Sequence, residues 1–471
     1  MNRNNEYKAL LEELDETPLK LDYTLERAQM KCEAKKRRKR KASFAPVWIA
    51  ATVFGVFVLL VNISPTFAYA AGRIPYLRDL AKFVALSPSL SAAVENEYVQ
   101  PINQEQTQNG ITARIEYAII DQKQLNIFYT LVSDTYSRMN ADPHISGVGE
   151  EKLEGYSTIF GELNAKNGDL RQITIDFSYD TVPDTVMLKL KVSDNGASAD
   201  DASAQAGLGL EEGMLSEEKH KEPEIISVFD FTLSLDPNFT AKGETIELNK
   251  GFKLDGQKFT LKSAEIYPTH MRFNFDDDKN NTAWLKNLEF YVETEKGERF
   301  EGISNGISAS GSTDSPMMAT HMLESAFFSD SEHLTLHITG VTWLDKDMEK
   351  VHVDLAGKTA EVLPEGVAFE LAKQKENGWI LGFSAPSYRE KYHDQMWNWN
   401  YFDRNGNEHS IGSSCSTMGG YYDEDTLQLL GSEDTPFTIL ALKNYPDNEV
   451  WLCPAYSRRT ALDTPVSIQI K

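Results

Sequence analysis

The sequence predicts a mainly β fold, in which a single transmembrane helix is followed by tandem immunoglobulin-like β-sandwich domains and preceded by short cytoplasmic helices. Three observations lead to this prediction. A dense basic block directly precedes an uncharged apolar run, short alternating strands separated by Gly, Asn and Asp turns fill the chain from Gly110 onward, and one strand pattern recurs along the chain. The repeated units are about 110 residues long, the size usual for immunoglobulin-like folds.

The first 43 residues carry two short amphipathic helical patterns. Tyr7, Leu10, Leu11 and Leu14 fall on one stripe of the first helix. A segment this short cannot bury a core by itself, so these side chains either dock on a membrane, another copy or a cytosolic partner, or belong to an exposed tail. We predict that the four residues form a cytoplasmic partner-binding site.

The predicted transmembrane helix is the run 44–63, which contains no charged residue. At about 1.5 Å per residue it spans roughly the 30 Å of a bilayer's hydrocarbon core. Ala68-Tyr69-Ala70 fits a signal-peptide cleavage pattern, but the apolar core of a signal peptide has only about 7 to 15 residues and a short basic leader. We therefore predict an anchor that is retained.

The charges around this run predict its orientation. Eight Lys and Arg residues lie between Lys31 and Lys41, whereas only Arg73 and Arg78 closely follow the run. Positive charge marks the cytoplasmic side and contacts anionic lipid headgroups. We predict a single-pass protein of the cell membrane, with its N-terminus cytoplasmic and its C-terminal region extracellular.

Net charge limits what the exported part can bind. The whole chain carries -24, and residues 1–43 carry 12 basic and 8 acidic side chains, so 35 basic and 63 acidic side chains remain, a net of -28. A surface this acidic repels nucleic acid, and we predict no nucleic-acid partner.

After the run, Pro75 begins a juxtamembrane amphipathic helix with Leu77, Leu80 and Val84 on one face. This face either rests on the membrane or packs on the first exported domain, and the sequence leaves both open. The predicted boundaries are 1–43 for the cytoplasmic segment, 44–63 for the transmembrane helix, 72–98 for the juxtamembrane helix and linker, and 99–243, 244–358 and 359–471 for three β-sandwich units.

The three units are predicted from a repeat. Segments beginning at Gly110, Gly256 and Gly366 align without gaps and place apolar residues in the same five columns. These columns are Ala113/Phe259/Phe369, Ile115/Leu261/Leu371, Leu125/Met271/Leu381, Ile127/Phe273/Phe383 and Tyr129/Phe275/Ala385. We predict that all are buried. The first unit is longer because of the insert 195–224, which has no aromatic residue and many small or acidic ones, and which we predict to be mobile.

Few residues suggest chemistry. No common catalytic signature is present, and we predict neither an enzyme nor a cofactor or metal site. Trp397, Trp399 and Tyr401 resemble a sugar-stacking platform, but the repeat aligns them with ordinary inward positions, which predicts core. Cys415 and Cys453 are expected outside the cell, where they either form a disulfide or remain two thiols.

The segments "KKRRKRK", "SPTFAYAAGRIPYLRDLAKFV" and "NGITARIEYAIIDQKQLNIFYTL" resemble the domain of unknown function 4179 family, single-pass membrane proteins of Gram-positive bacteria. The likeness covers about the first 130 residues, and the segment from Gly256 to Gly357 is similar to the immunoglobulin-like domain that often follows. The resemblance implies an anti-sigma-factor-like role. Residues 1–43 contain Cys32 but no His, which excludes the zinc-binding form of anti-sigma domain.

Together these observations predict a membrane regulatory or signalling protein. Its acidic exterior would sense or bind an extracellular ligand that the sequence does not identify, and residues 1–43 would hold a cytosolic sigma factor. The alternative is a membrane-anchored surface protein with a structural or adhesive role and no part in signalling.

Overall fold

The computed structural model describes residues 77–149, 151–160, 165–178, 181–194, 210–215, 224–312, 315–385, 396–432 and 435–471. The predicted cytoplasmic segment 1–43 and the predicted transmembrane run 44–63 lie outside these residues. Within the described ranges, no helix is both long and apolar enough to cross a membrane.

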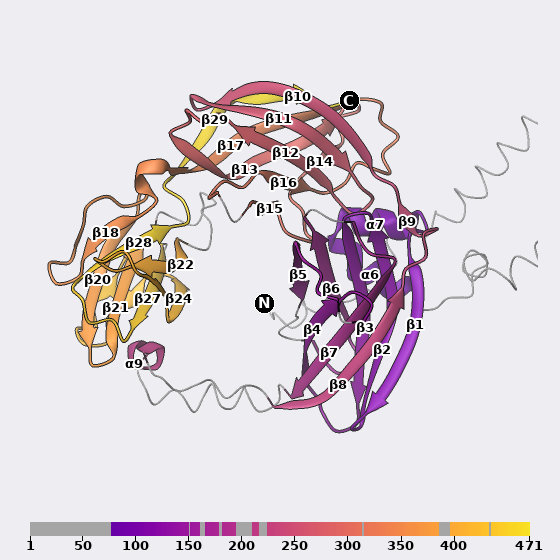
Figure 1. The fold of residues 1–471 in the computed structure, drawn as a ribbon, viewed down its shortest axis with the longest axis horizontal. Coiled ribbons are helices and arrows are strands. Elements are labelled where there is room, and N and C mark those ends of the chain that lie inside the picture. The colour runs from indigo at the N-terminus through magenta and orange to yellow at the C-terminus, as the bar shows by residue number, and fades with distance from the viewer. Residues whose placement is uncertain are drawn as a thin grey trace, which may run out of the picture. The chain divides into compact units, whose positions relative to one another are not determined.

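The described part of the chain is mainly β, which confirms the predicted fold class at this level (Figure 1). Apart from the short parallel contact of β9 with β2, all strand pairs are antiparallel. Described helices are short: α6 (Leu77–Phe83), η1 (Val84–Leu86), α7 (Pro88–Glu95), α9 (Leu210–Leu215) and η3 (Lys346–Met348).

The first unit consists of two sheets that enclose one core. One sheet contains β1 (Gln100–Gln108), β2 (Ile111–Asp121), β3 (Gln124–Ser133), β6 (Leu170–Phe177), β5 (Tyr156–Phe160) and β9 (Thr240–Ala241). The other contains β4 (Met139–Ser146), β7 (Thr185–Asp194) and β8 (Ile225–Ser234). Burial alternates along β4 and β7, and the inward side chains of both sheets share one hydrophobic cluster.

Amide side chains close one seam between these two sheets. The Gln-rich strand β1 lies at the edge of its sheet beside β8, the edge strand of the other. Side-chain amides donate to alternate β8 carbonyls, from Gln100 to Ser234 (2.9 Å), Gln104 to Thr232 (2.9 Å), Gln106 to Asp230 (2.6 Å) and Asn109 to Ile226 (2.7 Å). These bonds satisfy backbone groups that an open sheet edge would leave unpaired.

The second unit also has two sheets around one core. One contains β10 (Glu244–Leu254), β11 (Gln257–Ile266), β12 (Met271–Asp277), β16 (Thr320–Leu323) and β15 (Ala309–Ser310). The other contains β14 (Arg299–Phe300), β13 (Ala283–Thr294), β17 (Leu334–Asp345) and β29 (Arg458–Gln469). Trp343 is fully buried in the shared cluster and stacks on Phe259 at 5.8 Å between ring centroids.

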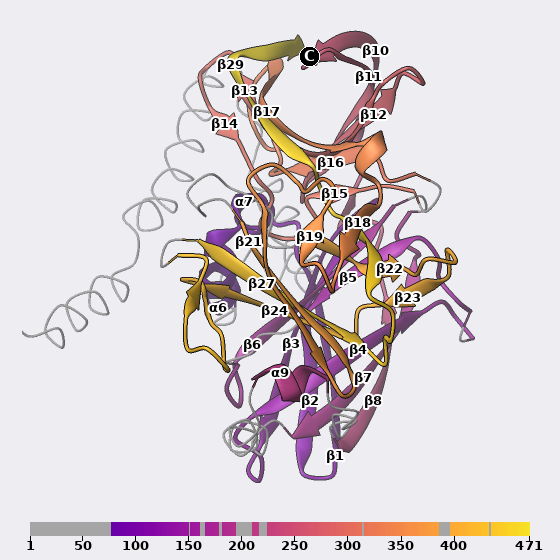
Figure 2. The ribbon, with the colours of Figure 1, turned by 90° about the vertical axis from the view of Figure 1, so that its left-hand side faces the viewer.

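The third unit repeats the two-sheet arrangement (Figure 2). One sheet contains β19 (Thr359–Ala360), β18 (Val351–Asp354), β28 (Glu449–Pro454), β22 (Trp397–Phe402) and β23 (Glu408–Ser410). The other contains β20 (Ala368–Lys375), β21 (Gly378–Ser384), β27 (Pro436–Lys443) and β24 (Ser413–Met418). A two-stranded hairpin joins β25 (Tyr421–Tyr422) to β26 (Leu429–Leu430).

The boundary between the second and third units differs from the one expected at 358/359. The last strand, β29, drawn in yellow, returns to pair with β17 of the second unit, while β18 already belongs to the third (Figure 1). The third unit is therefore inserted between two neighbouring strands of the second. Ser457 fastens this crossing, because its N–H donates to the Trp343 carbonyl at 2.7 Å and its hydroxyl to Asp345 at 2.7 Å.

The repeat columns are buried in all three units except at Phe369, which is half-buried. The β2–β3 and β11–β12 hairpins share one register at the predicted offset, each with a bulge at the same place, between Ile115 and Tyr117 and between Leu261 and Ser263. In the third unit the corresponding bulge comes two residues earlier, between Phe369 and Leu371. A bulge changes which face the following residues occupy, so Leu371 points away from its unit's core.

The helices α6, η1 and α7, which the sequence predicts to be juxtamembrane, pack on protein, one of the two arrangements that the sequence left open. Leu80 and Val84 are 0% and 2% exposed, and Phe83 meets Phe128 of β3 edge to face at 5.9 Å. Leu90 and Ala93 of α7 are also buried.

The three aromatic residues predicted for the core in β22 do not all lie there. Trp397 and Tyr401 are core residues as expected, but Trp399 is 58% exposed, because an irregularity in the pairing of β22 with β28 breaks the alternation between them.

Cys415 and Cys453 lie on different sheets and are both free thiols in the structure, so the disulfide alternative is not realised there. Burial raises the pKa of Cys453 to about 11.

Candidate functional site

The predicted partner-binding residues Tyr7, Leu10, Leu11 and Leu14 lie outside the described residues. In the described ranges, no group of three or more His, Cys, Asp or Glu residues is placed to hold a metal ion. Two buried ion clusters instead join parts of the chain that are distant in sequence. We call them the junction site, between the first and second units, and the α9 site, on the third unit.

The junction site is built around Asp121, which is completely buried at the end of β2, just before the turn to β3. Its Oδ1 accepts the backbone N–H groups of Lys123 and Gln124, each at 2.8 Å, which closes the turn locally. Its Oδ2 accepts from the second unit, at 3.2 Å from the N–H and 2.5 Å from the hydroxyl of Thr269. One carboxylate therefore shapes its own turn and binds the neighbouring unit.

A hydrogen-bond chain continues from Thr269 into β12. The Arg272 Nε–H donates to Nε2 of His270 at 2.6 Å. Because Nε2 accepts, the ring proton of a neutral His270 lies on Nδ1, which is 2.8 Å from the Thr269 hydroxyl. Arg272, His270, Thr269 and Asp121 thus form one hydrogen-bond relay that joins the second unit to the first.

Arg272 also holds the first unit directly. Its Nη1–H donates to the Phe177 carbonyl at 2.7 Å, and its Nη2 lies 3.9 Å from Oδ1 of Asp176. Arg272 and Asp176 are 2% and 1% exposed. Burial opposes ionisation of Asp121, but the interaction with His270 and the hydrogen bonds that Asp121 accepts hold the pKa of its carboxyl below the usual range.

Helix α7 enters the same junction from the N-terminal side of the first unit in the sequence. The buried carboxylate of Glu324, from the second unit, accepts the N–H of Ser89 at 2.8 Å and also its hydroxyl. The other carboxylate oxygen accepts the N–H and hydroxyl of Ser304 at 3.0 and 2.7 Å. Ser89 lies in the first turn of α7, where unpaired N–H groups and the helix dipole favour an anion.

The α9 site is the outer face of the sheet formed by β20, β21, β27 and β24, which faces away from the third unit's core. Its floor is a separate apolar cluster: Leu371, Ile380, Tyr421, Phe437, Ile439 and Ala441. Met214 and Leu215 complete this cluster and are 8% and 3% exposed. Helical spacing places Glu211 on the same face, whereas Glu212 and Gly213 are exposed.

Two lysines of β20 bind the buried Glu211 carboxylate. Lys373 and Lys375 are two residues apart on the outer side of the strand, and their Nζ atoms lie 2.9 and 3.0 Å from Oε1 and Oε2. The Tyr421 hydroxyl donates to Oε1 at 3.0 Å. Glu211 is 0% exposed, so both of its oxygens are matched to cations inside the site.

Lys373 has further partners that do not come from α9. Its Nζ lies 2.9 Å from Asp423 and 2.8 Å from Asp425, both of the third unit. Burial disfavours the ammonium, but the hydrogen bonds to these carboxylates and to Glu211 outweigh it and raise the pKa of Lys373. Burial likewise opposes ionisation of Asp423, while N–H groups of the following turn and Lys373 lower its pKa to about 2.

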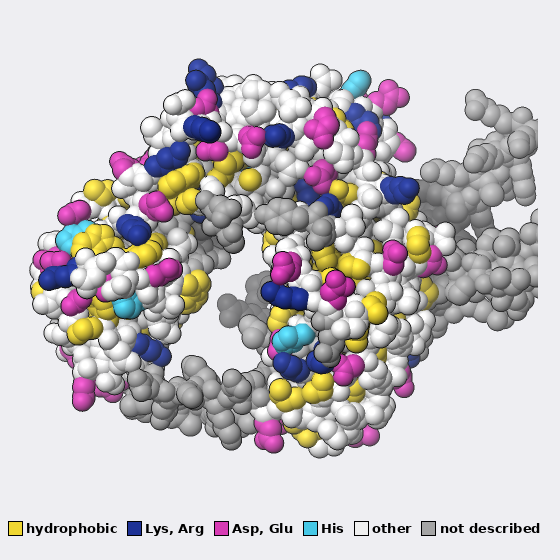
Figure 3. Space-filling view, in the orientation of Figure 1, with side chains coloured by type: hydrophobic (Ala, Val, Ile, Leu, Met, Phe, Trp, Pro, Cys, Tyr) yellow, Lys and Arg dark blue, Asp and Glu magenta, His cyan; other side chains and the backbone are white. Residues whose placement is uncertain are grey.

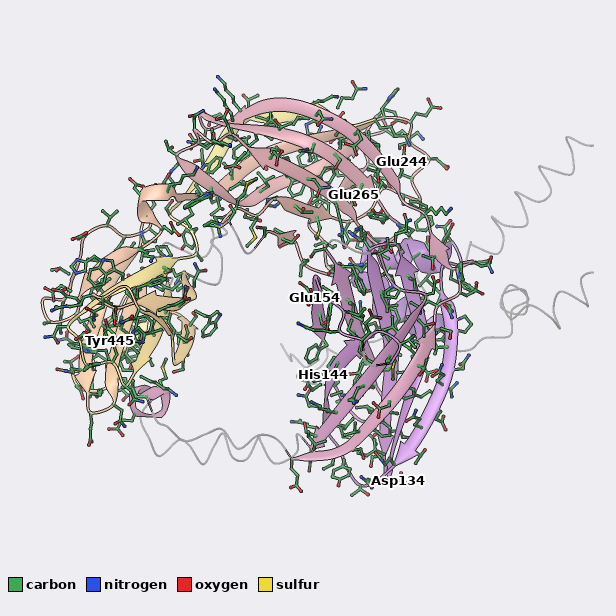
Figure 4. The ribbon with its side chains drawn as sticks, in the orientation of Figure 1. Asp134, His144, Glu154, Glu244, Glu265 and Tyr445 are labelled. Carbon is green, nitrogen blue, oxygen red and sulfur yellow. The ribbon has the colours of Figure 1, made fainter. Side chains whose placement is uncertain are left out.

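The outer face of the first unit holds a hollow of about 320 Å³ over β4, β7 and β8. It is lined by His144, Ile145, Ser146, Met187, Leu188, Lys189, Lys191, Asp230 and Phe231. His144 lies on β4 (Figure 4), and Lys and Arg side chains are mixed with Asp and Glu over the visible surface (Figure 3). Because side chains of both charges line this open face, the hollow does not indicate a particular class of ligand.

Sequence reasoning missed both ion clusters. Glu211 lies inside the insert 195–224, which was predicted to be mobile, whereas residues 210–215 form a helix with two buried apolar side chains. The spacing of Glu211, Met214 and Leu215 is a helical signal, but it covers only six residues. At the junction, the relay residues come from two units, and no local pattern connects them.

Comparisons with known proteins match two parts of the chain. Residues 35–133 match the family described as Domain of unknown function (DUF4179), and residues 243–371 match the Family of unknown function (DUF5643). No curated protein matches the chain. A solved structure described as "The crystal structure of the conserved domain protein from Bacillus anthracis" is similar with a TM-score of 0.37 and 14% identity, over 60% of this chain and 85% of that chain. A TM-score this low identifies neither a common fold nor a common function.

Proposed function

We propose, because residues 35–133 match the DUF4179 family, that the chain is a single-pass membrane regulatory protein with an anti-sigma-factor-like role. The run 44–63 is the membrane anchor, the segment 1–43 holds a cytosolic sigma factor, and the acidic C-terminal region binds a signal outside the cell. The three two-sheet units are immunoglobulin-like domains of this exterior.

One observation carries the proposal. The helices that follow the anchor in sequence are built into the junction of the first two units, through the Ser89 to Glu324 hydrogen bonds and the packing of Phe83 on Phe128. A change at this junction therefore displaces the segment that leads directly to the anchor. A passive tether would need no such connection, because an exposed linker would hold the exterior equally well.

The cytoplasmic end of this path is the apolar stripe of Tyr7, Leu10, Leu11 and Leu14. A short amphipathic helix binds by placing such a stripe in an apolar groove, and a few side chains then supply most of the binding energy. A charge on the stripe opposes this binding, whereas a charge on the opposite helical face remains in water. This difference provides a matched pair of variants.

The test is co-purification of a sigma factor with the full-length chain from its native membrane. Leu10→Asp with Leu14→Asp should abolish co-purification. Asn5→Asp with Ala9→Asp adds the same charges on the other face of the predicted helix and should leave it intact. Equal recovery with all three chains, or no sigma factor with wild type, would refute the regulatory role and favour an anchored structural or adhesive protein.

A further inference from the structure

The α9 site has the composition of a peptide-binding site. Its floor is apolar, and its two lysines lie on one side of that floor. The helix that occupies it is 6 residues long, and isolated helices shorter than about 12 to 15 residues are marginal in water. Residues 210–215 are therefore helical because they are bound, as a short peptide ligand is.

The ions of the site remain paired when α9 is absent. Lys373 keeps Asp423 and Asp425, and Lys375 keeps Asp425 at 3.8 Å. If α9 leaves the site, each lysine therefore keeps a carboxylate partner. A buried charge that loses its sole partner, by contrast, is strongly destabilising. What α9 would uncover is the apolar floor, and an exposed apolar face of this kind marks an interaction surface.

The bulge between Phe369 and Leu371 explains why Leu371 lies on this outer face. The equivalent strand of the second unit has its bulge two residues later, and Leu261 there points into the core. The shifted bulge of β20 turns Leu371 outward, in line with Lys373 and Lys375. One irregularity thus adds Leu371 to the apolar floor and brings it into line with the cations beside it.

We propose that the outer face of β20, β21, β27 and β24 binds a short helical peptide of a partner protein, and that α9 is a built-in competitor for this site. The peptide carries a carboxylate that lies between Lys373 and Lys375, with two apolar side chains three and four residues later. α9 shows this chemistry in Glu211, Met214 and Leu215. Because α9 is joined to β7 and β8 by 15 and 9 residues of chain, it competes at a high effective concentration.

The test uses the full-length chain and a fluorescent peptide with the sequence of residues 207–218, followed by polarisation. Met214→Asp with Leu215→Asp places charges on the floor side and should release α9. The released chain should bind the peptide at least tenfold more tightly than wild type, because occupancy by α9 raises the apparent Kd of the wild-type site. Gly213→Asp adds a charge on the exposed side of α9 and should bind like wild type.

A second peptide with Glu211→Lys and Met214→Asp distinguishes a specific site from an adhesive surface, and its use does not depend on how the variant chain folds. It should bind the released chain at least tenfold more weakly than the parent peptide. Equal binding of the two peptides, or equal binding of wild-type and released chains, would overturn the proposal. A wild-type chain that dimerises in sedimentation, and becomes monomeric when α9 is released, would assign the site to a second copy and also overturn it. None of these outcomes depends on a sigma factor.

Discussion

The junction site and the α9 site are both buried ion clusters, but they differ in where the compensating charge comes from. At the junction, the carboxylates of Asp121 and Asp176 belong to the first unit and the guanidinium of Arg272 to the second. At the α9 site, Lys373 already has two carboxylates of its own unit. The first arrangement makes the units depend on each other, whereas the second allows its occupant to leave. Similar residue types therefore build a permanent contact in one place and a reversible one in the other.

The largest expected effect is at Arg272. Arg272→Met leaves the Phe177 carbonyl and the buried carboxylate of Asp176 without this cation, and breaking a buried pair by removing one partner costs roughly 3–5 kcal/mol. Urea unfolding of the full-length chain should show this loss.

Arg299→Met is the matched control for that substitution. Arg299 binds Glu293 at 2.6 Å, but it is half exposed and lies on the surface. Exposed pairs contribute about 0–1 kcal/mol, so this variant should unfold close to wild type. If both variants lose the same free energy of unfolding, the first and second units do not depend on each other through Arg272.

A smaller effect, visible through pH, is expected at Asp121. Its pKa is lower in the folded chain, so the carboxylate contributes stability above the ordinary pKa of about 3.9, and this contribution is lost as the pH falls below that value. Asp121→Asn should cost about 1–3 kcal/mol near neutral pH, because it disturbs buried hydrogen bonds.

The difference between Asp121→Asn and wild type should then narrow between pH 4 and pH 2, as the wild-type carboxyl becomes protonated. Unfolding measured across this range gives the slope for each chain. Asp276→Asn, at an exposed carboxylate paired with Lys262, should stay within about 0.5 kcal/mol of wild type. A constant gap between Asp121→Asn and wild type would contradict a lowered pKa in the junction.

The β class and much of the core were predictable because strand alternation is a local signal. Phe273 and Phe383, placed in one column by the repeat, are both completely buried. The alternation misleads where a bulge intervenes, since Trp399 and Leu371 each turn away from the face that the pattern assigns to them. A bulge depends on the partner strand, which the local sequence does not specify.

The remaining features depend on contacts between distant segments. β29 reads as an ordinary strand, and nothing in its alternation indicates pairing with β17 of the preceding unit. The same is true of Arg272 and Asp176, which are 96 positions apart and carry no motif. For α9, low hydrophobicity predicts a mobile segment, and it does not reveal that two apolar side chains and one carboxylate suffice for a helix when a complementary face exists.

The smallest expected effect is at Gly213, and it distinguishes a reversible contact from a fixed one. Gly213 is exposed in α9, and a Cβ built there meets no atom within 4 Å. Gly in a helix interior is less favourable than Ala by roughly 0.5–1 kcal/mol, so Gly213→Ala should favour the bound helix by about that amount. Hydrogen exchange of the β20 and β21 amides should slow by about two- to fivefold if those amides exchange when α9 leaves. Amides of β12 at the junction should not change, because their exchange does not require this opening. A reversible α9 predicts that difference, whereas a helix that leaves only on global unfolding would slow both regions together.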